Sequence, residues 1–121
     1  MASTFRITTK ASIGVTASPT TLYTAPSGTT VIVLGMALCN KSANQVTVKV
    51  LLESDTATSV NTGAGAANDN VELVHDVVLE AGNTLEIMEG QKIILQTTDV
   101  LKVSASAGSA VDVTFSYMEQ T

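Results

Sequence analysis

The chain has 121 residues, a formal net charge of −5 and one cysteine, and only 14% of its residues are charged. This length is typical of a single domain, one cysteine excludes an internal disulfide framework, and six scattered Lys and Arg residues do not form a nucleic-acid-binding surface. No apolar run reaches the roughly 20 residues of a membrane span, and the first residues lack the apolar segment of a secretory signal. We expect a chain that is not secreted through a signal-peptide route and that binds neither nucleic acid nor membrane.

Residues 1–19 are rich in Thr, Ser and Ala, and Phe5 and Ile7 alternate there with polar neighbours. The alternation predicts an N-terminal arm or an edge strand. Pro19 separates this segment from residues 20–121, which we expect to form one domain. A turn is predicted at residues 25–28, where Pro26 sets φ at the second position and Gly28 stands at the fourth.

The segment from Thr29 to Cys39 is apolar at nearly every position. In a regular strand its side chains would divide between two faces, with Ile32, Leu34, Met36 and Leu38 on one and Val31, Val33, Ala37 and Cys39 on the other. A strand that is apolar on both faces is covered on both. We therefore expect the second face to meet another subunit, and Cys39 to be a small buried apolar residue.

The remaining segments also predict strands. Alternation is clearest at residues 45–53, with Val46, Val48, Val50 and Leu52 inward, and at residues 111–117, with Val111, Val113, Phe115 and Tyr117 inward. Further strands are predicted at residues 71–79, 84–88, 92–96 and 101–105. In the strand at 71–79 we expect an inward face of Val71, Leu73, His75, Val77 and Leu79. Eight or nine strands without a helical pattern predict an all-β protein, an antiparallel β-sandwich or jelly roll.

No residue pattern predicts catalysis, a cofactor or a metal ion, so we expect a protein that is not an enzyme. His75 is the only histidine, we expect it hydrogen-bonded near a sheet rim or bulge, and with Cys39 it cannot supply the usual ligands of zinc. The segment from Gly63 to Asn68 lacks the third glycine and the helix of a nucleotide-binding fingerprint. The long loop from 54 to 70 offers oxygen ligands for calcium, including Asp55 and Asp69, but their spacing matches no calcium-binding loop, so we expect solvated loop polarity.

Two stretches resemble small structural proteins of tailed-bacteriophage virions in their order of turns and strands. They are Leu22–Val33 and the run Leu79–Gly82, Leu85–Leu95, Thr98–Ser104 and Val111–Tyr117. The resemblance covers most of residues 20–119. It implies a β-sandwich that serves as a head decoration (cement) protein, a class that typically forms trimers bridging capsid subunits. A tail, neck, baseplate or fibre-associated subunit is the alternative within the virion.

We therefore predict a virion component, made in the host cytoplasm, that binds the major capsid protein or other virion subunits and self-associates, with a trimer favoured. Its candidate interface residues are Phe5, Ile7, Val31, Val33, Ala37 and Leu51. The loop from 54 to 70 is a further contact candidate. A carbohydrate-binding module is the alternative from another class, and it would depend on Tyr23 and Tyr117 because the chain has no Trp.

Overall fold

The computed structural model describes residues 2–54, 68–87 and 92–121. Within these ranges the chain forms nine strands and no helix, which confirms the predicted all-β class. The strands are β1 Ser3–Lys10, β2 Thr20–Thr24, β3 Thr30–Asn40, β4 Val46–Glu53, β5 Val71–Leu79, β6 Thr84–Glu86, β7 Ile93–Leu95, β8 Val100–Ala105 and β9 Val111–Gln120. No helix in these ranges is therefore long and apolar enough to cross a bilayer.

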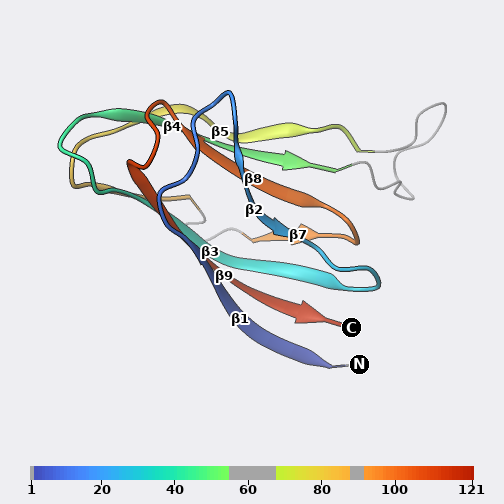
Figure 1. Cartoon of the computed structure of the whole chain (residues 1–121). Helices are drawn as coiled ribbons and strands as arrows, with labels where there is room; N and C mark the ends of the chain where they lie inside the picture. Colours follow the sequence, from blue (N-terminus) through green and yellow to red (C-terminus); the bar gives the residue numbers. More distant parts are fainter. Residues whose placement is uncertain (1, 55–67, 88–91) are drawn as a thin grey trace.

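The strands form two packed antiparallel sheets (Figure 1). One sheet has the order β1-β9-β3, with both β6 and β7 paired to the far edge of β3, and the other has the order β2-β8-β4-β5. Since β6 and β7 share one position beside β3, each sheet has four strand positions. Only the β4–β5 and β6–β7 connections stay within one sheet, and all others cross between sheets. This connectivity is that of a jelly roll.

The core lies between the sheets and consists mainly of aliphatic side chains. The alternation predicted for β4 and β9 is confirmed, because Val48, Val50, Val111 and Val113 are all buried. Phe115 is also buried, and aromatic packing extends from it to a tyrosine pair described below. The inner faces thus follow the period of two that a sheet with one buried face requires.

The predicted division of β3 into two apolar faces is wrong. The pairing of β3 with β9 shifts register between Val33 and Gly35, so that Leu34 is an extra residue in β3. Such a bulge reverses the alternation of all residues that follow it. The inner face of β3 is formed by Val31, Val33, Met36 and Leu38, all of them buried.

A second bulge changes the predicted inward face of β5. Val48 pairs with Val77 and Val50 pairs with Val74, so that two β5 residues, His75 and Asp76, lie opposite the single Lys49. Asp76 has a φ of 48°, a left-handed conformation that aspartate tolerates better than most residues. Val74 therefore enters the core, and His75 is exposed where an inward position was predicted. Of the other predicted inward residues, Leu79 is buried and Leu73 packs against the core, whereas Val71 and Val77 are exposed although they pair with Leu52 and Val48.

Residues 3–10, for which the sequence allowed an arm or an edge strand, form the edge strand β1. It pairs with β9 along its whole length, from Ser3 opposite Gln120 to Lys10 opposite Val113. The two chain ends consequently lie side by side (Figure 1). Within the described residues, β1 has no neighbour on its other side, so its outer edge is open.

Candidate interaction surface

Strand β1 directs apolar side chains away from the sandwich and polar ones toward it. Phe5 is 72% exposed and Ile7 is 63% exposed. On the inner side, Thr8 Oγ1 lies 3.0 Å from the Tyr117 hydroxyl, and Arg6 Nε donates to Glu119 Oε1 at 2.6 Å. These inner contacts determine which face of β1 points to solvent, so the exposure of Phe5 and Ile7 follows from the fold.

The register of three further strands places more apolar residues beside Phe5. Phe5 stands opposite Met118 of β9, Met118 stands opposite Ile32 of β3, and Ile32 stands opposite Ile94 of β7. Paired residues in antiparallel strands point to the same side of a sheet. An apolar row thus crosses four strands on the outer face, with Ile94 60% exposed at its far edge.

A hollow of about 280 Å³ lies next to this row, where β3 bulges. Its lining includes Leu34, Gly35 and Ala37 from β3 together with Thr114 and Ser116 from β9. A Cβ atom added at Gly35 would meet no other atom within 4 Å. The hollow therefore exists because Gly35 has no side chain and the residues around it on β9 are small.

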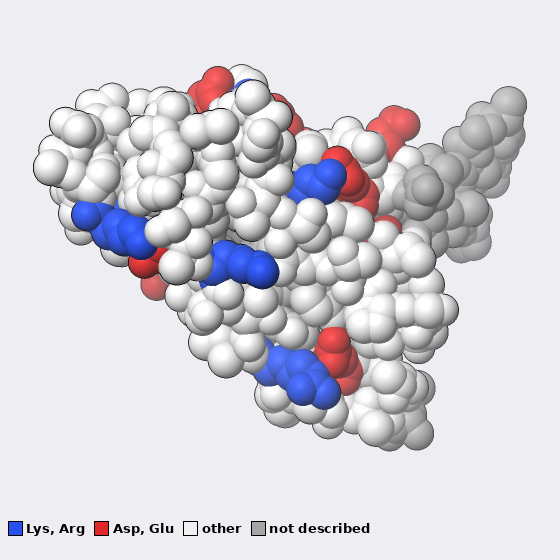
Figure 2. Space-filling view, viewed as in Figure 1, with Lys and Arg blue, Asp and Glu red and all other residues white. Residues whose placement is uncertain are grey.

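The outer face of the β1-β9-β3 sheet carries little charge in its middle. At one end, Lys41 Nζ lies 2.8 Å from Asp112 Oδ1, and on the β6 side Glu86 lines the hollow. Between them the register positions on β1, β9 and β3 hold apolar and hydroxyl side chains. On the side of the molecule visible in Figure 2, charged side chains occur at a few places that are separated by uncharged surface.

Beneath this face, an interior polar contact joins the two sheets. The Tyr23 hydroxyl of β2 donates to Glu119 Oε2 at 2.5 Å, and Tyr23 packs against Tyr117 with ring centroids 4.6 Å apart. The hydrogen bond from Tyr23, followed by that from Arg6, lowers the pKa of Glu119, whereas burial and the Glu119 carboxylate raise the pKa of Tyr23. Glu119 is thus held as a carboxylate that binds β1 and β2 to β9.

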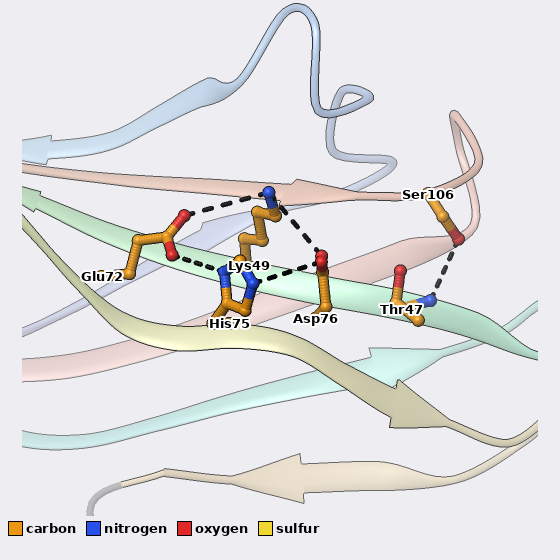
Figure 3. A network of polar contacts seen from close by, with 6 residues as sticks. All are labelled: Thr47, Lys49, Glu72, His75, Asp76 and Ser106. Carbon is orange, nitrogen blue, oxygen red and sulfur yellow. Dashed lines mark hydrogen bonds and ion pairs between the residues drawn. The ribbon is translucent and has the colours of Figure 1, made fainter.

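The outer face of the β2-β8-β4-β5 sheet differs, because it carries a polar network (Figure 3). His75 Nδ1 lies 2.5 Å from Glu72 Oε2, and His75 Nε2 lies 3.5 Å from Asp76 Oδ2. Lys49 Nζ lies between the two carboxylates, 3.9 Å from Glu72 and 3.7 Å from Asp76. The prediction that His75 points inward is wrong, since the bulge in β5 places His75 and Asp76 on the same side. The expected hydrogen bond near a bulge is confirmed.

The structure brings only some of the predicted interface residues to the surface. Phe5 and Ile7 are exposed, whereas Val31 and Val33 lie in the core, because the bulge at Leu34 places them on the opposite face from Ala37 and Cys39, with which they were grouped. Ala37 is half-buried beside the Gly35 hollow. Met118, Ile32 and Leu34 were missed, because only the register of the sheet places them beside Phe5 and Ile7.

Two other predicted positions also lie on outer faces. Leu51 is half-buried on the opposite sheet, where it is paired with Lys102 and Glu72. Cys39 is likewise half-buried, opposite Asp112, and is not the fully buried residue that was predicted. Both follow the local alternation of their strands.

The candidate oxygen ligands of the 54–70 loop are only partly described. Asp55 lies outside the described residues, as does most of the Gly63–Asn68 segment. Among the residues that are described, Ser54 Oγ donates to Asp99 Oδ1 at 2.7 Å, and Gln96 N donates to Asp99 Oδ2 at 2.9 Å. Both carboxylate oxygens of Asp99 are thus engaged within the fold. No group of three metal-ligating side chains occurs in the described parts of the chain.

No protein-family model and no curated protein sequence matches the chain. Among solved structures, it is similar to a protein of the T13 particle of infectious bursal disease virus, with a TM-score of 0.52 and 9% identity over 97% of this chain and 30% of the viral one. A second similar chain, from the Gx strain of that virus, has a TM-score of 0.54 and 11% identity over 97% and 32% of the two chains. This chain spans about a third of their length, and at this identity the similarity shows a common fold.

Proposed function

We propose that this protein is a structural subunit of a virus particle, which acts by binding neighbouring protein subunits. The observation that carries the proposal is a jelly roll with one outer sheet face that is uncharged in its middle and leaves Phe5 and Ile7 in water. Jelly rolls serve as capsid, lectin and cupin domains. An exposed apolar patch rimmed by polar groups favours a protein contact over the other two roles.

In its finer form, the proposal is a decoration (cement) protein on the head of a tailed bacteriophage, in contact with the major capsid protein. The resemblance of the turn and strand order over residues 20–119 to small phage virion proteins supports it. That resemblance also favours self-association as a trimer. A tail, neck, baseplate or fibre position is the alternative within the virion, and the same surface would serve it. We also propose that the protein acts without catalysis or a cofactor.

The carbohydrate-binding alternative depended on Tyr23 and Tyr117, and both rings pack in the interior of the fold. Tyr117 is buried, and the half-buried Tyr23 packs its ring on Tyr117 and gives its hydroxyl to Glu119. Neither ring is available as a platform for a sugar. Among the described residues, the large exposed aromatic side chain is Phe5.

The location of the chain in purified particles tests the proposal. Particles are isolated from a lysate in which the gene is expressed, the chain is sought by mass spectrometry, and its density is located by electron cryomicroscopy. An icosahedral distribution over the head supports decoration, and a ring or axial position supports the tail or neck alternative. Absence of the chain from particles whose other structural proteins are detected would overturn the proposal.

A further inference from the structure

We propose that the outer face of strands β1, β9 and β3 is a two-fold interface with a second copy of this chain, in which Ile7 of each copy enters the Gly35 hollow of the other. The inference goes beyond the proposed function, since it names a partner for this face and does not require a virus particle. It rests on four observations: a projecting side chain, a hollow at the same level, a symmetry constraint and the distribution of charge.

The projecting side chain and the hollow lie at the same level of the sheet. Ile7 stands opposite Ser116 of β9, and Ser116 stands opposite Gly35 of β3. Neighbouring strands are about 4.8 Å apart, so Ile7 and the hollow are separated by roughly 10 Å, with the small Ser116 between them. The face therefore has a ridge on β1 and a depression on β3, on either side of β9.

Because both features lie on one face, their docking has a single symmetry. For Ile7 of one copy to enter the hollow of another, the same face of the two copies must point in opposite directions. A rotation that relates two copies in this way is always a half-turn. A two-fold axis running along β9 places β1 of each copy over β3 of the other and preserves the levels. Both contacts then form together, which makes the interface isologous and closed.

The same axis produces favourable contacts elsewhere on the face. Phe5 of one copy comes over Ile32 of the other, and the Met118 side chains of the two copies meet near the axis. Along β1, β9 and β3 the middle of the face contains no charged side chain, so none is buried there. Glu86, which also lines the hollow, is on β6, outside the three strands that overlap in the dimer. The Lys41–Asp112 pair lies toward one end, where it remains in solvent.

The area that the two copies share is that of a weak dimer. Three strands at about 4.8 Å span about 14 Å, and the eight residues of β1 at about 3.4 Å span about 27 Å. Each copy thus contributes on the order of 400 Å², or roughly 800 Å² in total, which is the size of a weak, transient interface. We therefore expect a reversible dimer. This geometry excludes a trimer through the same face, although the resemblance favours a trimer.

Sedimentation equilibrium of the purified chain up to about 100 µM tests the proposal. The expected mass is that of two chains. Ile7→Lys removes the projecting apolar group and should weaken association roughly 50-fold, while Gly35→Leu fills the hollow and should reduce the mass to that of one chain. The matched control is Val78→Lys, which alters a 51% exposed residue of the other sheet and should leave the dimer intact. Circular dichroism and thermal unfolding check that each variant remains folded.

A wild-type mass of one chain throughout this range would overturn the proposal, and so would a mass of three chains. A dimer that is lost in Ile7→Lys but intact in Gly35→Leu would also overturn it, and would point to pairing of the open β1 edges. Each of these results is independent of whether the chain is found in virus particles, so the inference and the proposed function can fail separately.

Discussion

The two outer faces of the sandwich have similar strands beneath them and different chemistry. On the β2-β8-β4-β5 sheet, Lys49 lies between Glu72 and Asp76, and Lys102 Nζ lies 3.1 Å from Glu53 Oε2. On the β1-β9-β3 sheet, the middle of the outer face is apolar or hydroxyl-bearing. Exposed ion pairs contribute little to stability, but burying them is costly. The first face is therefore suited to water and the second to another protein surface.

The bulges in β5 and β3 have different effects on the two outer faces. In β5, the extra residue brings His75 and Asp76 to the same charged surface as Lys49. In β3, the extra residue Leu34 and its neighbour Gly35 open a hollow in an uncharged surface. Both bulges change which side chains face outward while the inner face remains apolar.

The largest expected effect is the loss of folding when a charge is introduced on an inner face of a sheet, in contrast to an outer face. Val113→Asp buries an unpaired charge between the sheets, which costs several kcal/mol and is comparable to the whole stability of a domain. We expect an unfolded or aggregated chain by circular dichroism. Thr114→Asp, one residue away but on the outer face, should fold like the wild type. Native spectra from Val113→Asp would contradict the assigned face of β9.

The next effect concerns the apolar face alone. Phe5→Ser combined with Ile7→Ser should change the free energy of unfolding of the monomer by less than about 1 kcal/mol, because both side chains are exposed. Binding to purified particles that lack the chain should weaken by roughly 2–4 kcal/mol. Quantitative gel analysis of sedimented particles measures the amount of bound chain. Val78→Ser on the outer face of the other sheet is the control, and an equal loss in both variants would abolish the distinction between the faces.

The interior contact beneath the apolar face should show itself in the pH dependence of stability. The pKa of Glu119 is lowered in the folded chain, so its carboxylate stabilises the fold above the ordinary glutamate pKa, and this contribution is lost as pH falls through the lowered value. Glu119→Gln should lower the free energy of unfolding at pH 7 by about 1–3 kcal/mol and reduce its decline in acid. Urea unfolding between pH 7 and pH 3 measures both. Glu80→Gln, in an exposed turn, should retain the wild-type profile.

The smallest effect is expected on the charged face. Lys49→Met removes the ion pairs with Glu72 and Asp76, and we expect the free energy of unfolding to change by no more than about 1 kcal/mol. The residual difference should shrink at high salt, since exposed pairs are screened. A loss well above this value, unaffected by salt, would show that the network is structural and not a solvated surface.

The sequence predicted those parts of the fold in which alternation is uninterrupted. In β4 and β9 the buried residues are the ones that the period of two indicates, because each strand has one face in the core. In β3 the same rule failed beyond one point, since a bulge inserts a residue and reverses the phase, and in β5 it failed at Val74 and His75, between two register shifts. Gly35, a glycine inside a strand pattern, was the available signal for the first of these bulges.

The candidate surface could be predicted only in part for a related reason. Phe5 and Ile7 follow from local alternation within one strand, and the sequence identified them. Met118, Ile32 and Ile94 join them only through the pairing of four strands that are distant in the chain. That register depends on non-local contacts and on the bulge, and a short stretch of sequence predicts neither of them. Val31 and Val33 were misplaced for the same reason.

Hydroxyl-radical footprinting of the chain in its assembled particle tests the central claim most directly. The extent of labelling is measured by mass spectrometry at Phe5, Ile7 and Met118 on one face and at His75 and Val78 on the other, with the unfolded chain as reference. We predict strong protection of the first three side chains and free labelling of the other two. Protection of His75 and Val78 with free labelling of Phe5 and Ile7 would contradict the account.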